Sequence, residues 1–216
     1  MSTHPLKRDR ERPPPNLTLA PDVSLRQGRL HEACGPARRS LALWVASQMQ
    51  GPVFWISPPW TVERLYPQGI KQLLHPGRVT FLSPTRAEDV LWTLEEVLRS
   101  GEVPLAIGDL PGLPALTPVR RLHLAAEQGG AAAGRQPLGL ILTPAEGGAA
   151  GVESRWHMAP RHTRGLNSWD LKRLRARTAP VKEWPVTLGP RGFAIAEPQK
   201  SPIGTGKPKN DLAKVE

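Results

Sequence analysis

Apolar positions along the middle of the chain recur with two different periods, which predict strands and helices in alternation. Strands are predicted at residues 29–34, 52–57, 78–82, 103–108 and 138–142, and the segment 52–57 is nearly continuous in apolar residues, as a strand buried on both faces should be. Between them, helical spacing predicts a helix over residues 37–50, whose apolar face holds Leu41, Trp44, Val45 and Met49.

The clearest helix covers residues 86–100, where apolar residues recur every three or four positions. Thr85 and Glu88 have the spacing of a capping box at its start, and Gly101 is placed to end it. A further helix is predicted to begin with Thr117 as its N-cap and Pro118 at its first position, and to end near Gly129.

This order of elements predicts an α/β fold with a mostly parallel sheet that is flanked by helices. After residue 143 the pattern changes to strand-like segments at residues 154–158, 169–177 and 183–188, separated by turns rich in Pro and Gly. We expect these segments to extend the sheet as antiparallel edge strands.

The two ends of the chain differ in charge from its centre. The 216 residues carry 29 Lys and Arg against 19 Asp and Glu, and the excess lies in residues 1–40 and 151–216. Residues 1–22 and 197–216 are polar and poor in large apolar side chains, which predicts a disordered basic, Pro-rich arm and a disordered basic tail around a domain of residues 23–196. Basic ends favour a polyanion or an acidic protein as partner, although they can also serve only to keep the chain in solution.

Several classes of protein are disfavoured by composition. The single cysteine, Cys34, cannot form an intramolecular disulfide or a Cys-rich zinc site, and the six histidines lack the spacing of a metal-ligand pair. No stretch of 18 apolar residues predicts a membrane span, and the charged first residues do not resemble a secretory signal. We therefore expect a cytoplasmic protein without a metal or a membrane partner.

A remnant of a phosphate-binding loop lies between the first predicted strand and its helix. The full pattern, G-x-x-x-x-G-K-[ST], cradles phosphates with backbone N–H groups and a lysine. Here the segment reads HEACGPARRSLALWVA: Gly35 and Ser40 remain, but the second glycine and the lysine are missing. Arg39 supplies charge, but its branched guanidinium does not replace a lysine that threads such a loop. We expect no nucleotide cofactor.

These residues carry a family resemblance. QGRLHEACGPARRSLALWV resembles the segment of RecA-type ATPases that leads into their phosphate-binding loop, and SGEVPLAIGDL resembles the approach to their Walker B strand. The order of LHEACGP, PVFWI, ADVLWTLEEVLRSG, RRLHLAAEQGG, ESRWHMAP and the late WDLKRLRAR…EW is similar to that of the ImuA-like proteins, which are RecA-fold relatives that include the SulA-type division inhibitors. The resemblance spans about residues 23–188 and implies a RecA-like fold.

The departures from the family pattern remove its chemistry. The position of the RecA catalytic glutamate falls in the segment SPPW at residues 57–60, which holds no carboxylate. Asp109 matches the Walker B aspartate, but one acid cannot position Mg²⁺, phosphates and a water together. We therefore expect a protein that is not an enzyme, in which Asp109 caps the loop that follows its strand.

The resemblance implies a non-catalytic accessory protein of SOS-induced, error-prone translesion DNA synthesis. Its implied partners are an ImuB-like protein related to Y-family polymerases, RecA or DNA or both, and indirectly an error-prone replicative polymerase. A SulA-like division inhibitor that binds FtsZ and a residual RecA-type ATPase remain as alternatives. The basic C-terminal third of the chain favours the first interpretation.

The candidate binding residues lie in the segment RHTRGLNSWDLKRLRAR. In a regular strand Arg173, Arg175 and Arg177 share one face and Lys172 takes the other, so the arginines could follow a phosphate backbone. Trp156 and Trp169 could stack on unpaired bases nearby. The alternative is that Trp156, Trp169 and Trp184 are core residues of an edge hairpin and that the arginines form a solvated face.

Overall fold

The computed structural model describes residues 15–61 and 65–196. The helices are α1 (Arg38–Gln48), α2 (Pro67–Lys71), α3 (Ala87–Ser100) and α4 (Leu116–Ala133). The strands are β1 (Asn16–Ala20), β2 (Val23–Arg26), β3 (Leu30–Cys34), β4 (Val53–Ile56), β5 (Val79–Leu82), β6 (Leu105–Asp109), β7 (Leu138–Leu142), β8 (Ser154–Pro160), β9 (Ser168–Ala176), β10 (Lys182–Gly189) and β11 (Gly192–Ile195).

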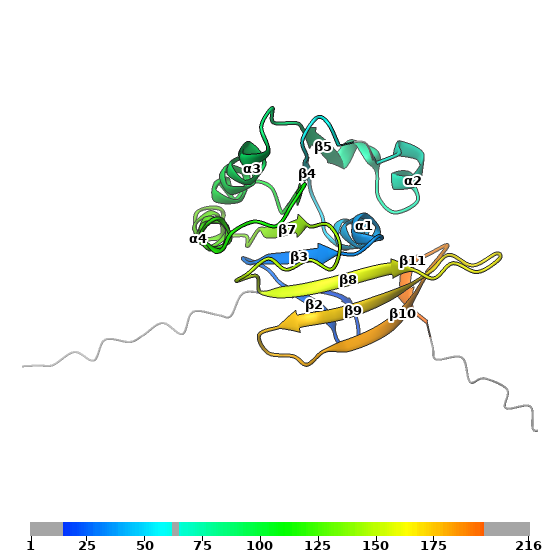
Figure 1. The fold of residues 1–216 in the computed structure, drawn as a ribbon. Coiled ribbons are helices and arrows are strands. Elements are labelled where there is room, and N and C mark those ends of the chain that lie inside the picture. Colours follow the sequence, from blue (N-terminus) through cyan, green and yellow to red (C-terminus); the bar gives the residue numbers. More distant parts are fainter. Residues whose placement is uncertain (1–14, 62–64, 197–216) are drawn as a thin grey trace, which may run out of the picture.

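A sheet of nine strands, in the order β11-β10-β9-β8-β3-β7-β6-β4-β5, runs through the molecule (Figure 1). The six strands from β8 to β5 are parallel, and β9, β10 and β11 continue the sheet in antiparallel pairing. This arrangement confirms the prediction of an α/β fold with a mostly parallel sheet and antiparallel C-terminal strands. We call the end at which the parallel strands terminate the carboxyl edge, and the opposite end the amino edge.

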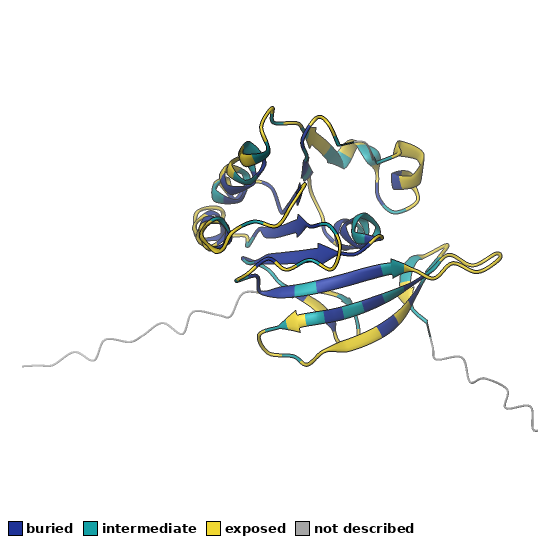
Figure 2. Cartoon of the chain, in the orientation of Figure 1, coloured by how far each residue is buried: buried dark blue, intermediate teal, exposed yellow. Residues whose placement is uncertain are grey.

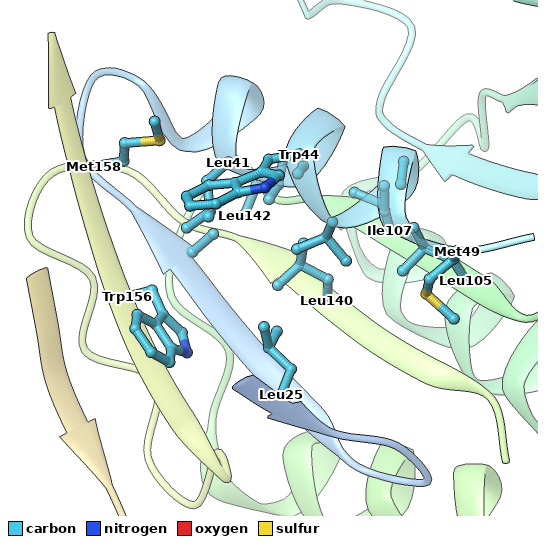
Figure 3. Close-up of a cluster of buried hydrophobic side chains, with 14 of the residues drawn as sticks. Leu25, Leu41, Trp44, Met49, Leu105, Ile107, Leu140, Leu142, Trp156 and Met158 are labelled. Carbon is cyan, nitrogen blue, oxygen red and sulfur yellow. The ribbon is translucent and has the colours of Figure 1, made fainter. Parts of the chain in front are cut away.

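Different elements cover the two faces of the sheet. Helices α3 and α4 pack on one face, over a core that includes Leu30, Leu98 and Ile141 (Figure 1). Helix α1 and the β1–β2 hairpin cover the other face, where Leu25, Leu41, Trp44 and Trp156 gather in one buried cluster (Figure 3). The central strands β3, β6 and β7 are buried along their whole length (Figure 2). The mostly apolar sequences of β6 and β7 predict this burial, whereas β3 also buries His31 and Glu32.

The sequence predicted both ends of α3 and both ends of α4, and one of these four predictions is confirmed. Gly101 ends α3 in the left-handed conformation, with φ of 71°, as predicted. The capping box is wrong, because α3 begins one residue later, with Arg86 as its N-cap and no side-chain hydrogen bond there. Helix α4 likewise begins after Ala115 rather than after Thr117.

Helix α4 also continues four residues beyond Gly129, where the sequence predicted its end. A Cβ atom on Gly129 would lie 2.0 Å from the carbonyl oxygen of Leu98 on α3. This glycine therefore permits a close approach of two helices, and Gly134, with φ of 67°, ends α4 instead.

The N-terminal boundary of the folded part lies before residue 23, contrary to the sequence prediction. Asn16–Ala20 forms β1, which pairs antiparallel with β2, and the side chain of Leu17 is buried in the cluster beneath α1. The alternating pattern NLTLA is the signal for this strand. Residues 1–14 and 197–216, which hold the rest of the predicted arm and tail, lie outside the described residues. Every helix in the described part is too short or too polar to cross a membrane.

Candidate functional site

The connection from β3 to α1 lies at the carboxyl edge of the sheet, where the phosphate-loop remnant was predicted. Gly35 adopts φ of 85°, and a Cβ atom there would lie 2.6 Å from both His157 Nε2 and the carbonyl oxygen of Met158. Only glycine fits a backbone that is left-handed and so closely covered. The strand β8 therefore occupies the space directly beside this loop.

The backbone donors of this loop are already used within the protein. The N–H of Gly35 donates to the carbonyl oxygen of Ala145 over 2.8 Å, and the N–H of Ala37 donates to that of Met158 over 2.9 Å. A phosphate-binding loop needs such N–H groups to point at the ligand. These two donors point at the loop after β7 and at β8 instead.

The start of α1 is held by an ion pair to the end of β6. Arg39 Nε donates to Asp109 Oδ2 over 2.7 Å, and Arg38 Nε lies 3.9 Å from Asp109 Oδ1. Two arginines at a helix N-terminus are unfavourable because that end carries partial positive charge, and the buried carboxylate of Asp109 offsets both. The sequence suggested that Asp109 caps the loop after β6. In the structure its carboxylate instead anchors the start of α1. Ser40 lies in the first turn of α1 and is half-buried.

A pocket of about 230 Å³ opens beside Arg39, at the carboxyl ends of β4 and β5. Its lining combines the apolar Trp55, Leu65 and Phe81 with the hydroxyls of Ser57, Thr61 and Ser83, together with Pro58 and Pro59. The described lining contains no carboxylate. The pocket thus lies where the family resemblance places a catalytic glutamate, and no residue of its described lining could act as a general base that activates a water.

A buried carboxylate that the sequence analysis did not single out organises the same edge. Glu32 is fully buried in β3, and its Oε1 accepts hydrogen bonds from Thr143 Oγ1 at 2.7 Å and from the N–H groups of Gly148 and Ala149 at 2.9 and 3.1 Å. Its Oε2 pairs with Arg155 Nε at 2.5 Å. A lone acidic residue within an apolar strand was the available signal. Glu32 fixes the loop after β7, which in turn accepts the hydrogen bond from Gly35.

The thiol of Cys34 lies next to this network and is buried. Burial, reinforced by the charge of Glu32, raises the pKa of Cys34 to about 12. A thiol with so high a pKa is not a nucleophile at neutral pH. Among the described residues, no group of three or more His, Cys, Asp and Glu side chains is arranged to hold a metal ion.

The predicted row of three arginines on β9 is not formed. Trp156 pairs with Arg173 and Arg155 pairs with Arg175, so that Leu174 is an extra residue in a β-bulge. Neighbours along β8 point to opposite faces, so Arg173 and Arg175 also do. The bulge, which residue types alone do not predict, reverses the alternation on which the prediction rested.

Arg173 is a buried residue of the core. Its guanidinium carbon lies 5.6 and 5.1 Å from the ring centroids of Trp156 and Trp184. Its Nε donates to the carbonyl oxygen of Pro180 and its Nη1 to that of Asp22, each over 2.9 Å. This arginine therefore ties the β1–β2 hairpin and the β9–β10 loop to the sheet.

The remaining predicted site residues lie in two environments. Trp156 and Trp169 are buried, so the interpretation of the tryptophans as core residues is confirmed and base stacking on them is not open. Lys172, on the other face of β9, pairs with Glu183 at 2.9 Å. Arg175 and Arg177 are exposed, and Arg177 Nε lies 3.4 Å from Glu153 Oε2.

A comparison of the sequence with models of protein families and with curated proteins finds no match.

Proposed function

We propose that this chain is a non-catalytic, cytoplasmic accessory protein with a RecA-like fold, similar to the ImuA-like proteins. It acts in SOS-induced, error-prone translesion DNA synthesis by binding. Its partners are an ImuB-like protein related to Y-family polymerases and DNA or a RecA filament, and through them an error-prone replicative polymerase.

The observation that carries this proposal concerns the loop around Gly35. The backbone N–H groups that would bind a phosphate in a phosphate-binding loop here donate hydrogen bonds to carbonyl oxygens of the protein itself. The loop stands between a buried parallel strand and a helix, which is the position of a phosphate-binding loop. Its N–H groups at Gly35 and Ala37 donate to backbone carbonyls, and Arg39 neutralises the acid at the end of β6. A fold that keeps this geometry and fills it with its own groups suits an adaptor better than an ATPase.

Charge supports a polyanionic partner. The sequence carries a net charge of +10, with the excess in its first 40 and last 66 residues. Such a balance favours association with nucleic acid, or with a protein assembled on it. Because Arg173 is a core residue, the nucleic-acid contact cannot be the three-arginine row that the sequence suggested.

Thermal unfolding with Mg-ATP tests the loss of the nucleotide site. A ligand at a hundredfold over its Kd stabilises a folded protein by about 2.7 kcal/mol, so a nucleotide that binds would raise the Tm clearly. We expect no rise in Tm at millimolar Mg-ATP, and a clear rise would overturn the expectation that the chain does not bind nucleotide.

Co-purification with candidate partners tests the rest of the proposal. We expect the full chain to retain an ImuB-like protein in a pull-down and not to retain FtsZ. Retention of FtsZ without the ImuB-like protein would favour the SulA-like alternative.

A further inference from the structure

A second hollow lies at the amino edge of the sheet, on the opposite side from the loop around Gly35. We call it the amino-edge pocket. It holds about 230 Å³ between the β1–β2 hairpin, the start of β8 and the end of β9. Arginines from three separate segments line it, namely Arg26, Arg173 and Arg177, together with the polar side chains of Asn16, Ser24 and Thr178.

Positive charge is in excess here. Arg29 adjoins the same group, because it lies near Glu153 as Arg177 does, and it also pairs with Glu127. The carboxylate of Asp22, whose charge interacts with Arg173, pairs with Lys182. Within residues 15–61 and 65–196, the side chain of Arg26 makes no hydrogen bond or ion pair. Burial lowers the pKa of the Arg29 guanidinium, and the charge of Arg26 adds to this effect.

The one carboxylate in the lining, Glu153, leaves hydrogen-bond donors of these arginines without an acceptor. Glu153 is buried, and its Oε2 lies 3.4 Å from Arg177 Nε and 3.9 Å from Arg29 Nε without a hydrogen bond to any described group. The guanidinium groups therefore keep donors that a further anion could use.

A chain of hydrogen bonds connects the neutral polar groups at the floor of the pocket. Trp156 Nε1 donates to Ser154 Oγ over 2.7 Å, and Ser154 Oγ lies 2.7 Å from His31 Nδ1. His31 Nε2 lies 2.9 Å from the carbonyl oxygen of Arg26, so this nitrogen carries a proton, and burial lowers the pKa of His31 to about 4, which favours the neutral imidazole. This chain of hydrogen bonds fixes the backbone that presents Arg26.

We propose that the amino-edge pocket binds phosphate groups of single-stranded DNA. This inference rests on the proposed function and gives it a contact surface. The planar donors of arginine match phosphate oxygens in pairs, and the hydroxyl and amide groups of the rim supply further donors. The indole of Trp156 is buried, so the contact is to the backbone and does not depend on base sequence.

The shape of the pocket favours a flexible strand over a duplex. Arg173 lies at the bottom of the hollow and is largely buried, so a phosphate must enter the hollow to approach it. A single strand can bend into such a recess, whereas duplex DNA is stiff over about 150 base pairs.

Binding of the full chain to a fluorescein-labelled oligothymidylate, followed by anisotropy over a series of salt concentrations, tests the proposal. The pocket variant is Arg26→Ala with Arg177→Ala, and the control variant is Arg120→Ala with Arg191→Ala, which removes equal charge from exposed positions on α4 and in the β10–β11 turn. We expect the pocket variant to bind more weakly, with the log–log salt slope reduced by about 1.4, or 0.7 for each lost contact. The control variant should change the slope less.

Three results would overturn the inference. The first is an equal loss of affinity and slope in both variants, because charge alone would then explain binding. The second is stronger binding of a labelled polyglutamate peptide than of the oligonucleotide, which would assign the pocket to an acidic protein segment. The third is a Tm that rises in sodium phosphate, relative to sodium chloride of equal ionic strength, without binding of the oligonucleotide, because the site would then take free phosphate.

The two proposals can fail separately. Circular dichroism of both variants should match that of the unmodified chain, since Arg177, Arg120 and Arg191 are exposed and the half-buried Arg26 makes no side-chain hydrogen bond within the described residues. If the pocket variant binds DNA normally but the chain retains its ImuB-like partner, the inference is wrong and the proposed function stands. If the partner is not retained, the proposed function fails whatever the pocket binds.

Discussion

The two edges of the parallel sheet treat their charged groups in opposite ways. At the carboxyl edge the buried carboxylates of Asp109 and Glu32 are each matched by an arginine and, for Glu32, by backbone donors. At the amino edge Arg26, Arg173 and Arg177 line an open hollow in which Glu153 is the one carboxylate, and Glu153 lies near Arg177 and Arg29 without a hydrogen bond to either. The carboxyl edge is where open α/β sheets generally hold their ligands. In this protein that edge is closed by internal pairs, and the unmatched charge lies at the other end.

This difference separates stability from binding. Breaking an internal pair leaves a buried group without its partner and lowers the free energy of unfolding. Removing an unmatched exposed cation leaves the fold unchanged and affects only what the surface binds. Substitutions should therefore fall into two classes, namely those that break an internal pair and lower stability, and those that remove an exposed cation and change only binding.

The largest effect is expected at Glu32. Glu32→Ala would leave Arg155 without its carboxylate and Thr143 and two N–H groups without their acceptor, so we expect a loss of about 3–5 kcal/mol in the free energy of unfolding. Urea denaturation measures it. Glu146→Ala is the matched control, because this carboxylate is 79% exposed in the same loop and should change stability by no more than about 0.5 kcal/mol. Equal effects of the two variants would contradict the contrast.

An intermediate effect should appear as pH dependence at the amino edge. Burial lowers the pKa of His31 to about 4. Between pH 6.5 and pH 4 the unfolded chain takes up a proton at His31 that the folded chain does not, so stability falls as the pH falls and levels off below pH 4. At 1.36 kcal/mol for each pH unit the loss amounts to about 3 kcal/mol.

Urea denaturation across this pH range, with His31→Gln for comparison, isolates that contribution. The variant should be less stable at pH 7 because its hydrogen bonds to Ser154 and Arg26 change, but its stability should fall less steeply with acid. A profile as steep as that of the unmodified chain would show that His31 does not titrate in this way.

The smallest effects divide the arginines of β9. Arg173→Ala removes a guanidinium that contacts two tryptophans and donates to two backbone carbonyls, so we expect a loss of about 2–3 kcal/mol. Arg175→Ala, two residues away on the opposite face, should change stability by no more than about 0.5 kcal/mol. Thermal unfolding of both variants decides the matter, and similar Tm values would mean that the bulge does not separate these side chains.

Most of the fold could be predicted from the sequence because the strongest signals for strands and helices are local. The buried strands β6 and β7 have nearly uninterrupted apolar sequences, and α3 has a regular apolar stripe that ends at Gly101, so period and composition suffice to place them. Helix α4 ran past its predicted end because Gly129 serves packing against Leu98, a contact between distant segments. The sequence alone does not show whether a glycine ends a helix or allows a second helix to approach closely.

The candidate site was harder to predict because it depends on the register of β8 and β9 and on ion pairs between residues far apart in the sequence. One extra residue at Leu174 turned an expected arginine row into one buried side chain and two exposed ones. The pairing of Arg39 with Asp109 joins residues 70 positions apart, which only the folded sheet brings together. The missing lysine and glutamate, in contrast, could be read directly because motif positions are local.

The position of β3 has a consequence for how the chain folds during synthesis. This strand is made early, yet its two neighbours in the sheet, β7 and β8, follow it by more than a hundred residues. Closing such long loops before any contact rewards it makes non-local pairing slow. We expect the β1–β2 hairpin to form first and β3 to stay unpaired until residues 138–157 have left the ribosome. The centre of the sheet then closes shortly before β9, β10 and β11 are added, and β3 is exposed to chaperones until that point.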